Sequence, residues 1–223
     1  MLITDIENAL TDRLRRGLGE MVWDVTSYAG ELDDDIGKII HRLPGAWVTF
    51  GGIVKTEPYS LSRQKWKTTG RFVVVVGDYN TRNEESTRHG GTNLNEVGTN
   101  LLVESVRRLI TGQDLGLKIK EFTPGCVRTL FNTSVEEKAV SVFACEFDTV
   151  WMENALENGR WPERSNSQDS PDVAFNVYRG ELSDPYPDLL RVGMRYHQPG
   201  TPPADDPTDL VEVRKKEDGT NQG

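Results

Sequence analysis

With 223 residues, the chain is long enough for one ordinary domain with an appendage, or for two very small ones. Its formal net charge is −9, and both parts are acidic: residues 1–156 have 18 basic and 22 acidic side chains, and residues 157–223 have 8 and 13. Neither part has the positive surface that binding to a phosphate backbone requires, which argues against sequence-specific nucleic-acid recognition. An acidic protein can still line a passage for DNA, because repulsion keeps the DNA from sticking.

No apolar run approaches the roughly 18 residues of a membrane span. The N-terminus is charged and amphipathic, a pattern that is not typical of a signal peptide. We therefore expect a protein that is made in the cytoplasm.

The N-terminal segment has the pattern of an amphipathic helix. Within residues 3–18, apolar side chains recur at spacings of three and four and so share one face, and Gly17 and Gly19 are expected to help end the helix. A first strand is predicted at Met21–Tyr28. For Glu31–Leu43 a short helix and a loop both stay open, because glycine and three consecutive aspartates have poor helix propensity.

The centre of the chain has the clearest strand pattern. Ala46–Lys55 and Gly70–Gly77 are rich in β-branched and aromatic residues and predict an antiparallel pair. Phe72–Val76 is apolar at every position, so we place it in the middle of the sheet with both faces covered. The polar stretch between the two runs, Thr56–Thr69, is predicted to be a long exposed connection.

A polar segment, a helix and two more strands follow. Asp78–Thr92 is charged, ends in two glycines and predicts a mobile loop. Asn93–Gly112 repeats apolar residues at helical spacing and is the best helix in the chain, with its last glycine in the C-cap region. Lys118–Asn132 and Lys138–Met152 predict a second pair of strands.

Together these elements predict an α+β fold, a mostly antiparallel sheet with one or two long helices packed on a face. In the last strand, alternate residues from Phe143 to Trp151 share an apolar face, while Glu146 and Asp148 point to the other. Six aromatic residues are expected to fill the core: Trp47, Phe50, Phe72, Phe143, Phe147 and Trp151.

Residues 157–223 have a different character. Eight of the eleven prolines lie there, and the hydrophobic periodicity fades. Asp172–Glu181 is a candidate for one more strand, and His197–Asp209 predicts an extended or polyproline-like chain. Because aromatic and leucine side chains are scattered through this region, we interpret it as an extended Pro-rich C-terminal arm that becomes ordered against its own domain, residues 1–156, or against a partner.

The sequence contains none of the motifs that usually carry catalysis: no phosphate-binding loop, dinucleotide fingerprint, nucleophile elbow or paired-histidine metal motif. Its three histidines lie in unrelated segments, and Asp33–Asp35 lacks the alternating ligands of a calcium loop. Cys126 and Cys145 are interpreted as reduced core thiols, with a disulfide as the alternative. We therefore predict a non-enzymatic protein with no catalytic, cofactor-binding or metal-binding residues.

Six residues are candidates for contacts between subunits: Tyr59, Lys65, Trp66, Lys67, Arg88 and His89. The two aromatic residues lie in the predicted polar connection, where an exposed aromatic side chain is costly unless it meets another surface. The two lysines flank the tryptophan and can pair with an acidic neighbour, or simply be solvated. The last two residues precede a glycine pair whose backbone N–H groups could converge on an anion, although a flexible loop is the simpler interpretation.

Four stretches of the chain have a recognisable pattern: Met1–Glu7, Leu43–Ala46 at the start of a predicted strand, Gly70–Tyr79, and Asn93–Ile110. Through these stretches, residues 1–156 resemble the tail-terminator family of Mu-like bacteriophages and prophages. These motifs are structural, and the family has no catalytic residues to carry over. The segment after Glu157 is longer than is typical of the family.

The resemblance implies a small α+β subunit that forms a hexameric ring. Such a ring caps the tail tube, stops tail polymerisation and provides the docking surface for the head or neck. The implied partners are copies of the chain itself, the tail tube protein, a neck or head-completion protein and, in contractile phages, the tail sheath. Genomic DNA would pass through without specific binding, and no membrane or cofactor is involved. The protein would be made in the host cytoplasm and end in the tail or neck of the virion.

Two alternatives stay open. One is a head-completion or neck connector protein on the capsid side. The other, from a different class, is a small enzyme or a regulatory ligand-binding domain.

Overall fold

The computed structural model describes residues 2–28, 42–61, 64–80, 97–135, 138–165, 167, 170–184, 191–196, 199–200 and 207–212. The chain divides into two compact units, Met1–Asn158 and Gly159–Gly223. The described elements of the first unit are, in chain order, α1 (Leu2–Leu18), the short 3₁₀ helix η1 (Gly19–Met21), β1 (Asp24–Ser27), β2 (Gly45–Pro58), β3 (Lys65–Asn80), α4 (Thr99–Ile110), β4 (Thr123–Val135) and β5 (Lys138–Asn154).

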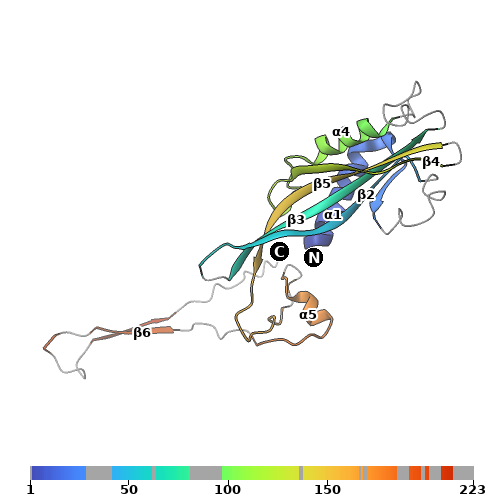
Figure 1. Ribbon diagram of the computed structural model, residues 1–223. Helices are drawn as coiled ribbons and strands as arrows, with labels where there is room; N and C mark the ends of the chain where they lie inside the picture. The colour runs from blue at the N-terminus through green and yellow to red at the C-terminus, as the bar shows by residue number, and fades with distance from the viewer. Residues whose placement is uncertain are drawn as a thin grey trace, which may run out of the picture. The chain divides into compact units, whose positions relative to one another are not determined.

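The first unit is an α+β fold built on a five-stranded sheet in the order β1-β2-β3-β5-β4 (Figure 1). β1 runs parallel to β2, and all other neighbouring strands are antiparallel. The predicted fold class is therefore confirmed, and β3, which contains the all-apolar run Phe72–Val76, is the central strand as predicted.

Helices α1 and α4 cover one face of this sheet (Figure 1). α1 buries Ile6, Leu10, Leu14 and Leu18, which is the predicted apolar stripe. α4 buries Leu102, Val106 and Ile110 against the same core. Burying one such side chain contributes about 1.5–3 kcal/mol, so these two stripes hold the helices on the sheet.

Gly17 does not help to end α1, contrary to the prediction, because it lies inside the helix. A Cβ atom at Gly17 would come within 2.5 Å of the Leu109 side chain, so the glycine lets α4 approach α1 closely. The helix ends before Gly19, whose φ of +51° a glycine adopts readily.

The opposite face of the sheet carries a smaller apolar cluster. Its buried members come from β2, β3, β5 and the residues just before β2: Leu43, Trp47, Val75, Val140, Val142 and Ala144. Both faces of the central strand are thus apolar over Phe72–Val76. Of the six predicted core aromatics, four are buried, and Phe50 and Phe143 are partly buried against the main core.

The predicted exposed connection Thr56–Thr69 is wrong, because most of it is strand. β2 and β3 stay paired as far as Pro58 and Trp66, so only the residues between Pro58 and Lys65 link them. Cross-strand pairs explain why these polar residues form strands: Thr56 lies opposite Thr68, with their hydroxyl oxygens 3.5 Å apart. A polar composition is therefore compatible with a loop and also with a paired strand that has one face exposed to water.

The predicted loop Asp78–Thr92 also begins too early, since β3 continues to Asn80. Asp78 is 4% exposed, and its carboxylate accepts a hydrogen bond from the backbone N–H of Gly98 at 2.9 Å, immediately before α4. Gly98 has no side chain to cap α4, so Asp78 supplies the negative group that a helix N-terminus favours. The rest of that predicted loop, and Glu31–His41, lie outside the described residues.

The helix predicted at Asn93–Gly112 is confirmed over Thr99–Ile110, whereas the described residues Val97 and Gly98 precede α4, and Gly112 follows it at a φ of +74°. The second predicted strand pair is β4 and β5, although β4 begins at Thr123 and not at Lys118. The residues before β4 include a turn at Asp114–Gly116, in which Leu115 and Gly116 have positive φ.

The interpretation of both cysteines as core thiols is right for only one of them. Both are free, Cys145 is buried, and Cys126 is exposed. Cys126 lies in an irregular part of β4, where the pairing with β5 shifts between Pro124 and Val127. A bulge of this kind changes the direction of a side chain, which alternation along the strand could not reveal.

The second unit contains the short helix α5 (Val173–Val177) and the antiparallel pair β6 (Arg191–Arg195) and β7 (Thr208–Glu212). The strand predicted at Asp172–Glu181 is wrong: Tyr178 and Gly180 donate backbone hydrogen bonds to Ala174 and Phe175, closing a helical turn. Of the predicted extended segment His197–Asp209, the last two residues belong to β7.

Candidate assembly surface

The described residues contain no cluster of three or more His, Cys, Asp or Glu side chains that could hold a metal ion. The three histidines and Asp33–Asp35 lie outside the described residues. In the part of the chain that the structure describes, no helix is long and apolar enough to cross a membrane.

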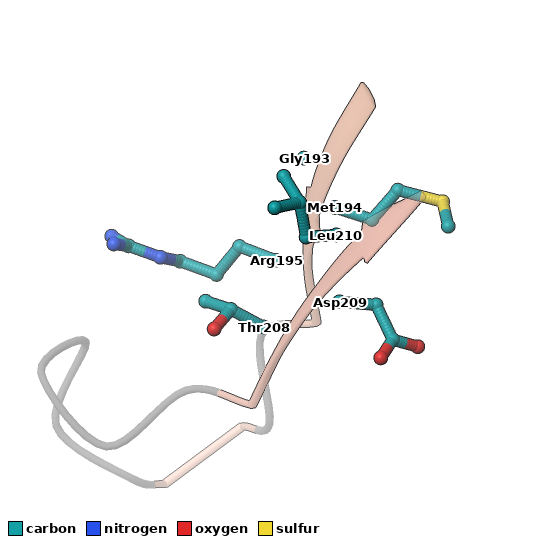
Figure 2. A pocket seen from close by; sticks show the side chains of 6 residues that line it. All are labelled: Gly193, Met194, Arg195, Thr208, Asp209 and Leu210. Atoms are coloured by element: carbon teal, nitrogen blue, oxygen red, sulfur yellow. The ribbon is translucent and has the colours of Figure 1, made fainter. Parts of the chain in front are cut away.

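A hollow of about 320 Å³ lies on the β6–β7 pair. Figure 2 shows Met194 and Asp209 pointing to one side of the ribbon, and Arg195 and Thr208 pointing to the other. Polar groups that bind a small ligand must converge on it, and these diverge.

A second hollow, of about 360 Å³, lies between α1 and the turn that follows α4. Its charged groups are already engaged: the Arg13 side chain donates to the Leu109 carbonyl, and the Asp114 carboxylate accepts from the backbone N–H of Gly116 at 2.9 Å. Neither hollow therefore presents a constellation for chemistry.

The most distinctive described feature of the first unit is a projecting part of the sheet, here called the distal extension, which comprises residues 53–61 and 64–70 of the β2–β3 hairpin and residues 149–154 of β5. Figure 1 shows the hairpin reaching past the two helices. Its end is closed by two backbone hydrogen bonds, from Tyr59 to Lys65 and from Ala155 to Gln64, each 2.8 Å long.

At the base of the distal extension, Trp151 packs over Gly70 and forms the last buried layer of the core. A Cβ atom at Gly70 would lie 2.2 Å from the Trp151 ring, so the glycine leaves the space that the indole fills. Trp151 is 4% exposed, and its ring N–H donates to the Glu153 carboxylate at 2.8 Å. This stacking fixes the base of the distal extension to the core.

Beyond that layer, large apolar side chains are exposed. Leu61 is fully exposed, Tyr59 is 65% exposed, and Ile53, Val54 and Met152 are each about half exposed. Beside them, Lys55 and Glu57 form a 2.8 Å ion pair, and the hydrogen bond from Lys55 lowers the pKa of Glu57. Exposed apolar groups among charges on a projecting, hydrogen-bonded element are typical of a protein–protein contact.

The structure brings four of the six predicted contact residues together on the distal extension. Tyr59, Lys65 and Lys67 are exposed there. Trp66 is only half-buried, because it lies in the middle strand of the extension, paired with Pro58 on one side and Glu153 on the other. Arg88 and His89 lie outside the described residues.

Leu61 and Trp23 are among the exposed residues that sequence reasoning missed. Leu61 is a single large apolar residue within a polar stretch, and that isolation was a usable signal. Trp23 is 79% exposed, and its backbone N–H bonds to the Pro44 carbonyl. No sequence pattern marked it, since it follows directly on buried Val22.

The face of the sheet opposite the helices carries a network of four charges. The Arg71 guanidinium contacts Glu146 at 2.7 Å and Asp148 at 2.8 and 3.0 Å, and Arg128 contacts Glu146 at 3.0 Å. The hydrogen bond to Asp148 raises the pKa of Arg71 above its usual value. Glu146 and Asp148 point away from the helices as predicted, and the ion pairs explain how Glu146 tolerates being 5% exposed.

The described part of the first unit is therefore an α+β fold with a projecting part of its sheet that exposes large apolar side chains. The sequence profile of the family described as Bacteriophage Mu, Gp37 matches residues 2–152. The chain belongs to this family, which confirms the resemblance to Mu-like phage proteins and indicates a phage protein of structural type. No curated protein matches the chain.

Proposed function

We propose that this protein is a phage tail terminator, which forms a ring on the end of the tail tube, stops tail polymerisation and presents the surface to which the head or neck docks. Membership of the Bacteriophage Mu Gp37 family supports a structural role in the virion. The observation that carries the proposal is the distal extension, whose exposed Tyr59 and Leu61 give a rigid subunit a surface for a partner.

The physical logic is that of a cap. A terminator must recognise a repeating protein end and must not itself be a further tube subunit, so it needs contact surfaces of at least two kinds. The proposed partners are copies of the chain in a hexameric ring, the tail tube protein, a neck or head-completion protein and, if the tail contracts, the sheath. The net charge of −9 suits a ring through which DNA passes without binding.

Deletion of the gene tests this function directly. A phage without a terminator should produce abnormally long tails without heads. Tails of normal length without heads would instead identify a neck or head-completion protein, the alternative with the same structural character. Electron microscopy of lysates measures the tail lengths.

A second experiment uses purified components. Tail tube protein that is polymerising should stop growing when the chain is added at a small fraction of the tube subunits, and the chain should be found at tube ends. Unchanged tube lengths over a range of ratios would refute capping.

The contact role of the distal extension needs variants that leave the fold intact. Trp66→Ala is a poor choice, because the half-buried side chain lies in the middle strand. Tyr59→Ser and Leu61→Ser remove exposed groups and should weaken assembly at least tenfold, while Leu101→Ser, at a 46% exposed position on α4, serves as the control. Equal assembly by all three variants would exclude the distal extension as a contact.

A further inference from the structure

Among the described residues, the sheet of the first unit has two edges that pair with no further strand. On one side, β1 pairs with Gly45–Val48 of β2, so Thr49–Pro58 forms the rest of what is here called the first edge. On the other side lies β4, the second edge, which pairs only with β5 among the described strands. Open strand edges present N–H and C=O groups that can pair with another strand.

Large apolar side chains are exposed along both edges. The first edge has Trp23, directly before β1, and Ile53 and Val54, which are 54% and 51% exposed. The second edge has Val127 and Leu130, at 39% and 38%. Natural edge strands are usually protected by charge, so apolar groups on both edges call for an explanation.

Val54 and Leu130 share a structural feature. Each is the extra residue of a β-bulge: the β2–β3 register skips Val54 between Ile53 and Lys55, and the β4–β5 register skips Leu130 between Thr129 and Phe131. A bulge redirects the side chain of the extra residue and bends the strand. Each edge thus exposes an apolar side chain at a position that the regular strand pairing skips.

We propose that the first edge of one copy of this chain pairs with the second edge of the next copy, with Val54 and Leu130 at the contact. This inference deepens the proposed ring by naming the surfaces that join its subunits. The natural complement of a strand edge is another strand edge, and every copy carries one of each. Since the two edges lie on opposite sides of the sheet, the contact is head-to-tail, and it forms a ring when the rotation at each step returns the last copy to the first.

Charge is compatible with this pairing. Arg128 on the second edge has a 61% exposed side chain, although it also contacts Glu146. On the first edge, Lys55 and Glu57 already pair with each other at 2.8 Å. Each edge therefore presents a neutralised ion pair beside its bulge and not a single sign of charge, so the pairing avoids a large like-charge repulsion.

The structure also limits how far the pairing can extend. The backbone N–H of Phe50, on the first edge, already donates to the Glu7 carboxylate at 2.7 Å. A contact that starts beyond Phe50 spans at most Gly51–Pro58, or roughly 27 Å of strand at about 3.4 Å per residue. Such a contact is weak by itself, but closing a ring makes the last contacts intramolecular and greatly strengthens the whole.

Cysteine cross-linking tests the proposal. The variant combines Val54→Cys and Leu130→Cys with Cys126→Ser, and buried Cys145 stays in place. Within one copy, β2 and β4 are separated by β3 and β5, about 14 Å at three strand spacings, which exceeds the roughly 7 Å limit for a disulfide. Any disulfide between the two positions must therefore join two copies.

Under mild oxidation we expect a ladder of covalent multimers that ends at one closed species. The matched control replaces Val54→Cys by Leu101→Cys, which is similarly exposed on α4. Cross-linking no stronger than in this control overturns the proposal. A second cross-linking test needs only the substitution Val54→Cys in a chain that keeps Cys126. Because Cys126 is exposed on β4, it can form a disulfide with the new cysteine.

Amide hydrogen exchange gives an independent readout on the unmodified chain. The β4 amides that face away from β5 should exchange at least tenfold more slowly at assembling concentrations than in dilute solution. Val54→Asp and Leu130→Asp should abolish this protection, whereas Leu101→Asp should not. Protection that is unchanged on dilution, or that the two edge variants retain, would overturn the proposal.

The two proposals fail separately. Rings that cross-link through the edges but do not stop tube growth would refute the terminator function and support the edge contact. Tube capping by a protein whose edges do not cross-link would support the function and refute the edge contact.

Discussion

Replacing Arg71 tests whether the charge network on the face of the sheet opposite the helices holds the strands together. The guanidinium contacts both Glu146 and Asp148 of the neighbouring strand, at 2.7 to 3.0 Å. The Glu146 side chain is 7% exposed, so water cannot replace the lost partner. Arg71→Met keeps most of the aliphatic stem and removes only the charge.

The expected magnitude follows from burial. Breaking a buried ion pair by removing one partner costs about 3–5 kcal/mol. Here Arg128 still contacts Glu146 at 3.0 Å, and Asp148 is 26% exposed, so a reduced cost of about 2–3 kcal/mol is expected. For a unit of this size that corresponds to a Tm lower by roughly 5–10 °C.

Urea denaturation followed by tryptophan fluorescence measures this cost, with Arg128→Met as the control. Arg128 makes one contact in the network and its side chain is 61% exposed, so its loss should cost no more than about 1 kcal/mol. Adding Glu146→Gln to Arg71→Met should recover at least about 1 kcal/mol, because the uncompensated charge is then gone. Equal costs for the two arginine variants, or no recovery in the double variant, would refute the reasoning.

Three further predictions concern buried positions. Gly70→Ala should destabilise the first unit by about 1–3 kcal/mol and shift the tryptophan emission, because the new methyl group would lie 2.2 Å from the Trp151 ring; an unchanged denaturation midpoint would contradict the packing described. Asp78→Asn should cost about 0.5–2 kcal/mol in urea denaturation, since the charge at the start of α4 is lost while the shape is kept; Asp114→Asn, at an exposed turn, is the control. Burial raises the pKa of Cys145 from 9.0 to about 11, so the folded state retains the thiol proton more tightly than the unfolded state does. Its contribution to stability is complete below pH 9 and declines by up to about 2–3 kcal/mol as the pH rises to 11, and the same titration of Cys145→Ala should lack this part of the decline.

Much of the fold follows from hydrophobic periodicity. The stripe from Ile6 to Leu18 predicts α1, and the alternation from Phe143 to Trp151 predicts which face of β5 the helices cover. The uninterrupted apolar run Phe72–Val76 predicts the central position of β3. These predictions succeed because the hydrophobic pattern shows which side of an element is buried, whichever distant element covers it.

Predictions fail where a distant partner decides the outcome. Thr56 and Thr68 are polar and were predicted to lie in a loop, yet their hydroxyl groups pair with each other across β2 and β3. Asp78 reads as the first residue of a loop, and only the fold places it at the start of α4. Local composition cannot show such pairings, because sequence separation hides them.

The candidate surface shows the same division. The exposed aromatic Tyr59 was accessible to sequence reasoning, since an aromatic residue in a polar stretch is unusual. The exposed bulge residues Val54 and Leu130 were not, because each lies within a predicted strand, where alternation alone does not reveal a bulge. A bulge depends on the register between two strands, and register is a property of the pair.

These bulges also bear on how a chain with two open edges avoids indefinite growth. A flat, regular edge pairs with any other strand in any register, and so leads to aggregation. Here the extra residues at Val54 and Leu130 interrupt the ladder, and Glu7 occupies the N–H group of Phe50. Each edge therefore offers only a short stretch in one register, at an angle that the bulge fixes. A contact with a fixed angle suits the proposed ring, because the rotation between neighbouring copies decides whether a head-to-tail assembly closes or grows as a filament.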